Sequence, residues 1–157
     1  MTCALILVGS PGVANAMQDE PEQFLGIEWG ASIDKYRGDL KPLKEDGDSG
    51  YYRRVSDRPF FAGVEVRRIS YYFYKGSFTS GTYTTIGVRD LKSVLSYLAD
   101  HYGEPTETHP TFRVYVWEGK RSGVIVSCDV SISCYTEFYD KALREQALTA
   151  HGDPDDN

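Results

Sequence analysis

The sequence predicts an α+β domain: an antiparallel sheet of about six or seven strands with one main helix and two shorter helices packed on it. Three observations lead to this prediction. Apolar and polar residues alternate over several stretches, as in strands with one buried face. Tight turn signals separate these stretches, which is typical of hairpins, and one later segment carries apolar residues at helical spacing. The twelve tyrosines also favour strands.

The first elements are expected to be short. Residues 24–30 (FLGIEWG) predict a strand. Ser32 is a suitable cap for a helix of about two turns that reaches Leu40, since apolar residues recur on one side of that segment. Residues 41–50 are rich in charge and contain one proline and two glycines, so a loop is expected there.

Hairpins are expected next. Residues 51–55 predict one strand, and a longer strand is expected over 61–74 or 63–74. Residues 75–76 (KG) form a tight turn signal, and residues 78–86, rich in threonine, predict the returning strand. Strands joined by so short a turn pair in the antiparallel direction.

The clearest helix is expected over residues 90–102. Asp90 can cap its start, Gly103 stands where a left-handed residue commonly ends a helix, and Pro105 prevents continuation. The apolar stripe of this helix consists of Leu91, Val94, Leu95, Leu98 and Tyr102.

The last part of the chain predicts strands and a final short helix. Residues 114–117 predict a strand, and apolar side chains then occupy the even positions of 124–138. Because strands rarely exceed about ten residues, a hairpin that turns near 130–131 is favoured over one long strand. Residues 140–150 predict the last helix.

This hairpin bears on Cys128 and Cys134. Their separation along one extended strand would be about 20 Å, whereas a disulfide needs Cα atoms within about 7 Å. A straight strand therefore forbids the bond and a hairpin permits it. We expect a Cys128–Cys134 disulfide; two separate buried thiols and a metal or redox role are the alternatives, the last without a Cys-x-x-Cys motif to support it.

Residues 1–16 have the features of an export signal. An apolar run over residues 3–8 is followed by a Gly-Ser-Pro-Gly break and by the Ala-Asn-Ala pattern that signal peptidase accepts. The alternative is a buried N-terminal strand. The expected organisation is a signal cleaved near Ala16, a flexible lead over 17–23, a single domain over 24–150 and a disordered acidic tail over 151–157. Such a protein would reside in the periplasm or outside the cell.

The formal net charge of −6 argues against general binding to nucleic acid or to anionic membranes, since both favour basic surfaces. No segment is long and apolar enough to predict a transmembrane helix, and Cys3 comes too early to belong to a lipoprotein signal.

Two arginine doublets form a candidate anion-binding surface. Arg53 and Arg54 lie on one expected strand, and Arg67 and Arg68 lie on a strand that is expected to pair with it. In matching register, two arginines would share a face and could hold a carboxylate or phosphate in bidentate fashion. The alternative is solvated strand charges that discourage edge pairing.

Tyrosines form a second candidate surface. Alternation along residues 71–74 sends Tyr72 and Tyr74 to the face opposite the core, with Tyr83 near them. Exposed tyrosines suit a protein, peptide or glycan partner, because rigid rings offer contact area at low entropic cost. The alternative is that these tyrosines only stiffen a solvated sheet.

Catalytic chemistry is weakly represented. His101, Glu104, Glu107 and His109 form a loose cluster whose spacing matches no zinc motif. The sequence lacks a Gly-x-Ser-x-Gly elbow and a phosphate-binding loop after a strand. We therefore predict no catalytic residue, no metal site and no cofactor.

Three segments resemble small exported bacterial domains of unknown function: 24–32 (FLGIEWGAS), 72–76 (YFYKG) and 98–105 (LADHYGEP). The resemblance covers most of residues 24–143. It implies a periplasmic or surface location and an antiparallel sheet with helices, and it implies no reaction. The Gly-x-Ser helix opening before sheet hairpins is also similar to the helix-plus-meander architecture of outer-membrane assembly lipoproteins and β-lactamase inhibitor proteins.

The leading expectation for function is a non-catalytic exported binding or interaction module with a protein, peptide or glycan partner. An alternative is a carrier of a small molecule or anion that uses the arginine and tyrosine surface. A hydrolase is a third class, and it would need His101 or His109 to face a carboxylate in a cleft.

Overall fold

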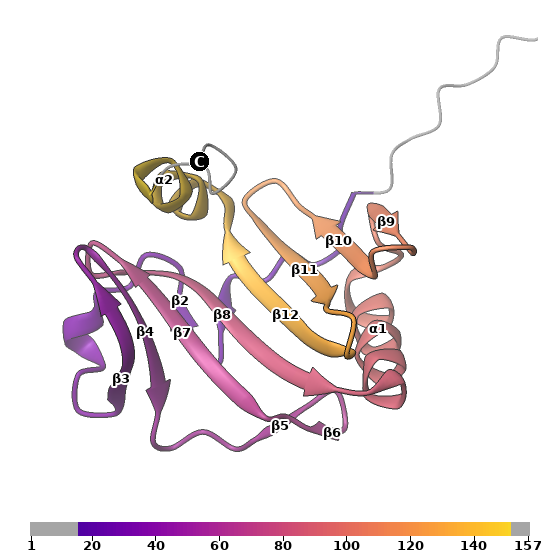
Figure 1. The fold of residues 1–157 in the computed structure, drawn as a ribbon. Helices are drawn as coiled ribbons and strands as arrows, with labels where there is room; N and C mark the ends of the chain where they lie inside the picture. The colour runs from indigo at the N-terminus through magenta and orange to yellow at the C-terminus, as the bar shows by residue number, and fades with distance from the viewer. Residues whose placement is uncertain (1–15, 152–157) are drawn as a thin grey trace, which may run out of the picture.

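The computed structural model describes residues 16–151, which form an α+β fold around one large antiparallel sheet (Figure 1). The predicted class and the antiparallel pairing are confirmed. Apart from Ala16, the predicted export signal lies outside the described residues, as does the predicted tail apart from His151.

The main sheet has eight strands, so the predicted six or seven was too few. Strand β12, the last in the chain, pairs with β8 on one side and with β11 on the other. It therefore joins the two halves of the sheet. In spatial order the strands are β3 (Leu40–Asp46), β4 (Ser49–Arg54), β7 (Arg68–Tyr74), β8 (Ser77–Ile86), β12 (Ser133–Asp140), β11 (Ser122–Cys128), β10 (Val114–Glu118) and β9 (Glu107–His109).

The described residues contain two α-helices, α1 (Val88–Tyr102) and α2 (Lys141–His151), rather than the three helices predicted. The expected helix after Ser32 is only a 3-10 turn, η1 (Ile33–Lys35), because the chain already enters β3 at Leu40. Two short ribbons complete the fold: β1 (Gln23–Phe24) with β2 (Ile27–Glu28), and β5 (Phe60–Phe61) with β6 (Val64–Glu65).

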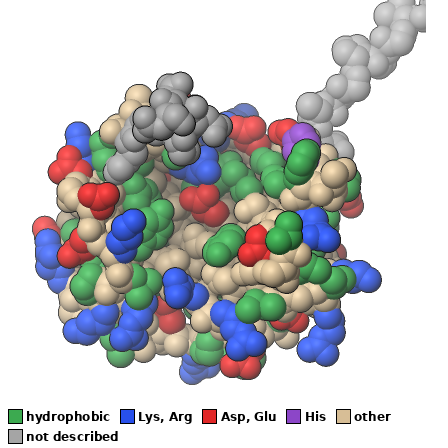
Figure 2. Space-filling model, viewed as in Figure 1, with side chains coloured by type: hydrophobic (Ala, Val, Ile, Leu, Met, Phe, Trp, Pro, Cys, Tyr) green, Lys and Arg blue, Asp and Glu red, His purple; other side chains and the backbone are tan. Residues whose placement is uncertain are grey.

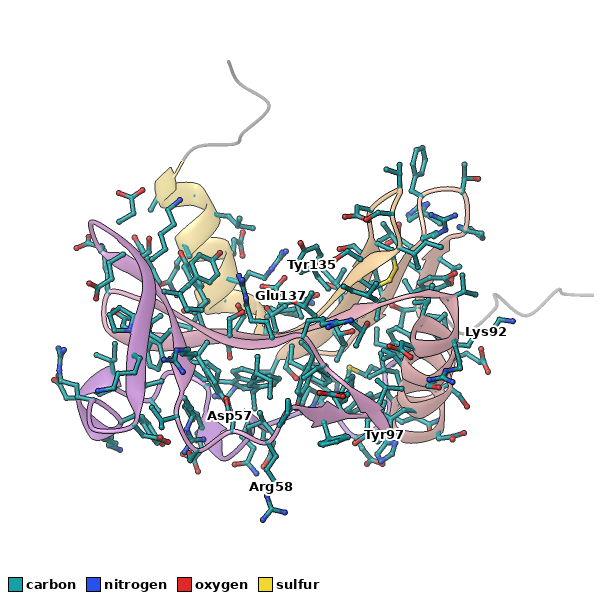
Figure 3. The ribbon with its side chains drawn as sticks, turned by 60° about the horizontal axis from the view of Figure 1, so that its bottom comes forward. Asp57, Arg58, Lys92, Tyr97, Tyr135 and Glu137 are labelled. Atoms are coloured by element: carbon teal, nitrogen blue, oxygen red, sulfur yellow. A yellow bond between two sulfur atoms is a disulfide. The ribbon has the colours of Figure 1, made fainter. Side chains whose placement is uncertain are left out.

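The two helices lie on opposite faces of the sheet. On β12, Phe138 is buried in the core on the α1 side, whereas the next positions on either side, Glu137 and Tyr139, contact Arg144 of α2. Figure 3 shows Glu137 and Tyr135 on the α2 side of the sheet. We call this side the open face; its residues include Tyr51, Arg53, Arg68, Ser70, Tyr72, Thr82, Thr84, Tyr135 and Glu137.

The core on the α1 face is rich in aromatic rings. Phe24 of β1 lies at its centre, with its ring centroid 5.0 Å from that of Tyr83 and 5.6 Å from that of Phe138. Helix α1 covers this core with Leu91, Val94 and Leu98, which are all buried. The spacing of its apolar stripe in the sequence predicted this face correctly.

The ends of α1 differ in how well they were predicted. The helix begins before Asp90, with Gly87 at the N-cap and no side-chain capping bond, so the predicted cap was wrong. At the other end Gly103 has a φ of +80° and its N–H donates to the carbonyl of Ala99. A left-handed residue there ends the helix as expected.

Strand β3 occupies a stretch that was predicted to be a loop. It is an outer strand that pairs only with β4, and its register shifts between Pro42 and Lys44. Outer strands tolerate proline and carry charge because one of their edges has no strand partner. The composition that indicated a loop is therefore also the composition of a protected edge.

The N-terminal segment 17–23 is packed against the fold, in contrast to the flexible lead that was predicted. Met17 is buried in the core. The Glu20 carboxylate accepts hydrogen bonds from the backbone N–H groups of residues 120–122 at 2.6, 2.8 and 3.1 Å. Partial burial would raise the pKa of Glu20, but these backbone donors lower it overall.

The β11–β12 hairpin forms where the alternation predicted it. Cys128 and Cys134 are directly opposite each other, their Cα atoms lie 4.1 Å apart, and a disulfide joins them. The Asp129 carboxylate accepts hydrogen bonds from the backbone N–H groups of Ser131 and Ser133 in the turn. Among the three alternatives for the cysteines, the structure has the disulfide.

Candidate functional site

Small hydroxyl side chains form the middle of the open face. The strand register places Ser70 opposite Thr82 and Thr82 opposite Glu137, and it places Thr84 opposite Tyr135 in the next row. Because these hydroxyl groups are short, larger side chains at the borders stand above them. Tyr135, which lies between Thr84 and Ser127, remains 48% exposed. The result is a polar strip flanked by rings and charges.

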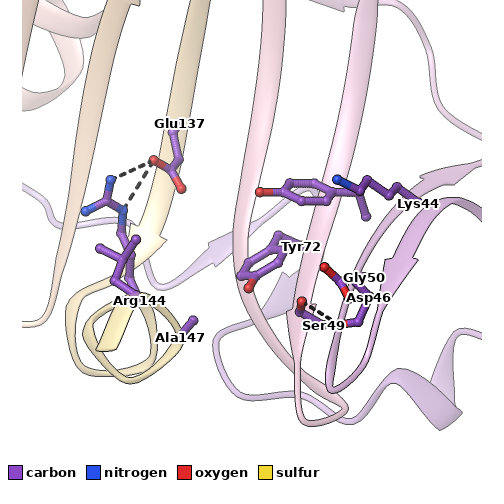
Figure 4. A pocket seen from close by; sticks show the side chains of 10 residues that line it. Lys44, Asp46, Ser49, Gly50, Tyr72, Glu137, Arg144 and Ala147 are labelled. Atoms are coloured by element: carbon purple, nitrogen blue, oxygen red, sulfur yellow. Dashed lines mark hydrogen bonds and ion pairs between the residues drawn. The ribbon is translucent and has the colours of Figure 1, made fainter. Parts of the chain in front are cut away.

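A groove of about 480 Å³ lies at one end of the open face, between α2 and the β3–β4 hairpin (Figure 4). Tyr51 and Tyr72 lie side by side in it, with ring centroids 4.7 Å apart. This tyrosine groove is lined by Lys44, Asp46, Ser49, Gly50, Tyr51, Tyr72, Glu137, Arg144, Ala147 and Leu148.

Helix α2 positions one wall of the tyrosine groove. Arg144 forms an ion pair with Glu137 at 3.3 Å, and its guanidinium lies 4.8 Å from the ring centroid of Tyr139. These contacts hold the helix against β12. The helix starts at the end of β12, where the Asp140 carboxylate accepts a hydrogen bond from the N–H of Leu143 at 3.0 Å.

The tyrosine groove presents neutral donors and both signs of charge. Burial raises the pKa of Tyr51, and the nearby Tyr72 and Glu137 raise it further, so its phenol keeps its proton at neutral pH. On the β3 wall, the exposed Lys44 and Asp46 form no ion pair with any residue that the structure describes. The groove can therefore accept ring contacts, hydrogen bonds and charged groups from a ligand.

The predicted arginines come together at the other end of β4 and β7. Pairing of these strands stops at Tyr52 and Tyr71. Beyond that point the strands separate around a cavity of about 260 Å³. We call this cavity the arginine notch; its lining consists of Leu43, Arg53, Arg54, Asp57, Pro59, Val66, Arg67, Arg68 and Ile69.

One of these arginines is already engaged within the protein. Arg54 forms an ion pair with Asp39 at 2.8 Å and donates to the carbonyl of Leu25 at 2.9 Å. Hydrogen bonds from Ser56 and then from Arg54 lower the pKa of Asp39. Asp57 accepts a hydrogen bond from the Tyr71 hydroxyl at 2.8 Å, and burial raises the pKa of this carboxyl.

The three tyrosines predicted for the partner surface lie in three environments. Tyr72 is half-buried in the tyrosine groove. Tyr74 is buried and lies beside α2. The expected position of Tyr83 near them was wrong, because Tyr83 is opposite Ile69 on the core face and its ring stacks on Phe61 at 4.1 Å.

His101 and His109 lie apart from both cavities. The His101 ring stacks on Tyr97 with centroids 3.9 Å apart, and its Nδ1 lies 2.8 Å from the Tyr97 carbonyl. His109 contacts the Glu107 carboxylate on the exposed strand β9. Within residues 16–151, no group of His, Cys, Asp and Glu side chains is arranged to hold a metal ion.

Of the residues that line the tyrosine groove, sequence reasoning predicted only Tyr72; the missed residues include Tyr51, Glu137 and Arg144. Tyr51 and Glu137 occupy positions that alternate with core residues on their strands. This alternation in the sequence could have placed both side chains on the open face. Arg144 had no such signal, because its place depends on how α2 leaves β12.

The comparisons with known proteins found no matching family model, no matching curated protein and no matching solved structure. Within the described part of the chain, no helix has the length and apolar character needed to cross a membrane.

Proposed function

We propose that this protein is a non-catalytic exported binding module that holds a partner protein on its open face, with the tyrosine groove at the centre of the contact. The observation that carries the proposal is the Tyr51–Tyr72 pair. Its rings lie side by side in a groove, and Tyr51 is 45% exposed. Aromatic side chains in a hollow commonly anchor protein interfaces.

The walls of the tyrosine groove favour a polypeptide partner. Lys44 and Asp46 on one wall supply both signs of charge, and Leu148 on the other wall is an exposed apolar side chain. A polypeptide can satisfy ring, apolar and charged contacts together. An uncharged glycan would leave the charged groups without partners.

Export is part of this proposal and has separate support. The sequence carries the features of a signal before Met17, and a disulfide is a bond that persists in oxidising compartments. Met17 is the first buried residue of the described core. Cleavage after Ala16 would therefore leave that core whole.

Site-specific photo-crosslinking in a host that exports the chain tests the proposal. A photoreactive residue replaces Leu148 at the rim of the tyrosine groove, where the native side chain is 52% exposed. The matched control replaces Phe112, which is 74% exposed in the loop between β9 and β10. We expect a discrete protein adduct from position 148 only.

The adduct should also depend on the rings. Tyr51→Ala, at an exposed position, should reduce its yield while the thermal unfolding midpoint stays close to that of the unchanged protein. Equal adducts from positions 148 and 112, or a yield that Tyr51→Ala leaves intact, would contradict the proposal. So would capture of a glycan in place of a protein.

A further inference from the structure

We infer that the arginine notch is a binding site for a small organic anion that carries a carboxylate or phosphate group. This inference concerns different residues from those of the tyrosine groove and does not depend on a protein partner. It starts from a break in the sheet. Beyond Tyr52, strand β4 stays paired with β3, and β7 stays paired with β8, but the two no longer pair with each other.

The break leaves short stretches of strand edge at the notch, where the Asp57 carboxylate engages the backbone of Arg54. Arg53 and Arg54 pair only with β3, and Arg68 and Ile69 pair only with β8, so each pair has one strand edge that faces the notch. The chain between the two strands leaves the sheet and passes through β5 and β6. The opening is only a few residues long, so it is too short to receive a further strand but large enough for a small ligand.

The charge around the notch is unbalanced. Four arginines line it, against the single carboxylate of Asp57. Arg54 is paired with Asp39. Within residues 16–151, Arg53, Arg67 and Arg68 have no ion-pair partner. Three arginines without an ion-pair partner among these residues thus line one cavity in a protein whose formal net charge is −6.

Protection of a sheet edge is a weak explanation for this arrangement. The doublets lie where the inner strands β4 and β7 separate, away from the outer strands β3 and β9. The opening is too short to receive another strand, so it needs less protection against edge pairing than an outer strand does. Alternation also sends Arg53 and Arg54 to opposite faces, so guanidinium groups approach the opening from both sides.

The chemistry of the lining sets the ligand class. A guanidinium has a planar fork of donors that matches a carboxylate or a phosphate, and several such groups together favour a ligand with more than one charged oxygen. The cavity of about 260 Å³ is at the small end for ligand sites, which suits a small metabolite-sized anion rather than a polymer.

Titration of the purified protein with inorganic phosphate, with citrate and with glycerol phosphate, each followed by backbone amide NMR at low ionic strength, tests this inference. We expect saturable shifts at residues 53–54 and 67–69 for at least one probe. The probe that binds most tightly identifies a phosphate or a carboxylate as the preferred group.

Two double variants that remove the same charge separate a site from general attraction. Arg53→Gln with Arg68→Gln should weaken binding by about tenfold or more, since it removes charge-assisted hydrogen bonds. Arg89→Gln with Lys92→Gln on α1 should change it by about twofold or less, because only the screened field of the protein changes. Thermal melts of both variants confirm that they fold.

Equal weakening by both double variants would overturn the inference, as would the absence of saturable shifts with all three probes. Binding of a polyanion such as dextran sulfate alone would also overturn it, since it would indicate a diffuse basic surface. Tyr51→Ala should retain anion binding. The proposal of an anion site and the proposal of a protein partner can therefore be refuted independently of each other.

Discussion

At the scale of single residues, Gly81 shows how a missing side chain can determine a fold. It lies in the middle of β8, opposite Tyr71 on one neighbouring strand and Phe138 on the other. The ring of Phe24 packs directly on its backbone, so that a Cβ at position 81 would overlap ring atoms. The contact between this aromatic ring and this glycine therefore helps to dock the ribbon β1–β2 on the sheet, together with the buried Ile27 of β2.

Gly81→Ala should destabilise the protein by about 1–3 kcal/mol, because the core must shift to accommodate a methyl group. Urea unfolding measures this change. Gly38→Ala is the matched control: position 38 has no neighbour within 4 Å and no left-handed backbone angle, so the same substitution should be neutral there. An equal loss of unfolding free energy at both positions would show that the contact with Phe24 is not the cause of the destabilisation.

The sequence predicted candidate residues better than it predicted their surroundings. The arginine doublets were expected to share a face of two paired strands; they line one cavity instead, at a point where β4 and β7 no longer pair. The tyrosines were harder because alternation assigns a face to a side chain only after another residue has fixed which face is the core. Tyr83 lies among threonines and a glycine, a pattern that resembles a solvated strand, yet its ring completes the core.

At the scale of elements, the residues that mark turns and helix ends predicted their elements correctly, whereas the outer strands of the sheet were not predicted. The Lys75–Gly76 turn has both residues at positive φ, as a tight hairpin requires, and Gly103 ends α1. Strand β3 was missed because charged residues and Pro42 make it resemble a loop, and β9 was missed because it is a polar segment of three residues between Pro105 and Pro110. Such residues are compatible with a loop and with an outer strand alike, and only the neighbouring strand resolves the choice.

The β11–β12 hairpin carries an element-scale prediction. The disulfide closes a loop of only a few residues, so its reduction should lower the free energy of unfolding by about 2 kcal/mol and leave the fold intact. Urea unfolding with and without a reductant measures this, and intact mass confirms two free thiols. Loss of the native circular dichroism on reduction alone would show that the bond does more than hold the hairpin register.

At the scale of the whole molecule, buried tyrosines make the fold sensitive to alkaline pH. Burial raises the pKa of Tyr102 to about 12, and it raises the pKa values of Tyr71 and Tyr83 as well. An unfolded tyrosine loses its proton near pH 10. The stability that these groups contribute is therefore fully present below about pH 10 and is lost as the pH rises through the folded-state values.

We expect the urea midpoint to fall steeply between about pH 9 and pH 12, together with a late step in phenolate absorbance. Tyr102→Phe should make this fall less steep, because it removes one of the groups that drive it. Tyr135→Phe, at a position that is 48% exposed, should leave the slope unchanged. An identical slope in all three proteins would contradict the assignment of the alkaline transition to buried phenols.

The central place of β12 has a consequence for the order in which synthesis of the chain completes the sheet. Strands β3, β4, β7 and β8 form one set and β9, β10 and β11 another, and only β12 hydrogen-bonds to both. Until residues 133–140 have emerged, the two sets have no strand in common. Completion of the sheet is thereby postponed to nearly the end of synthesis, a delay that is compatible with the export proposed above.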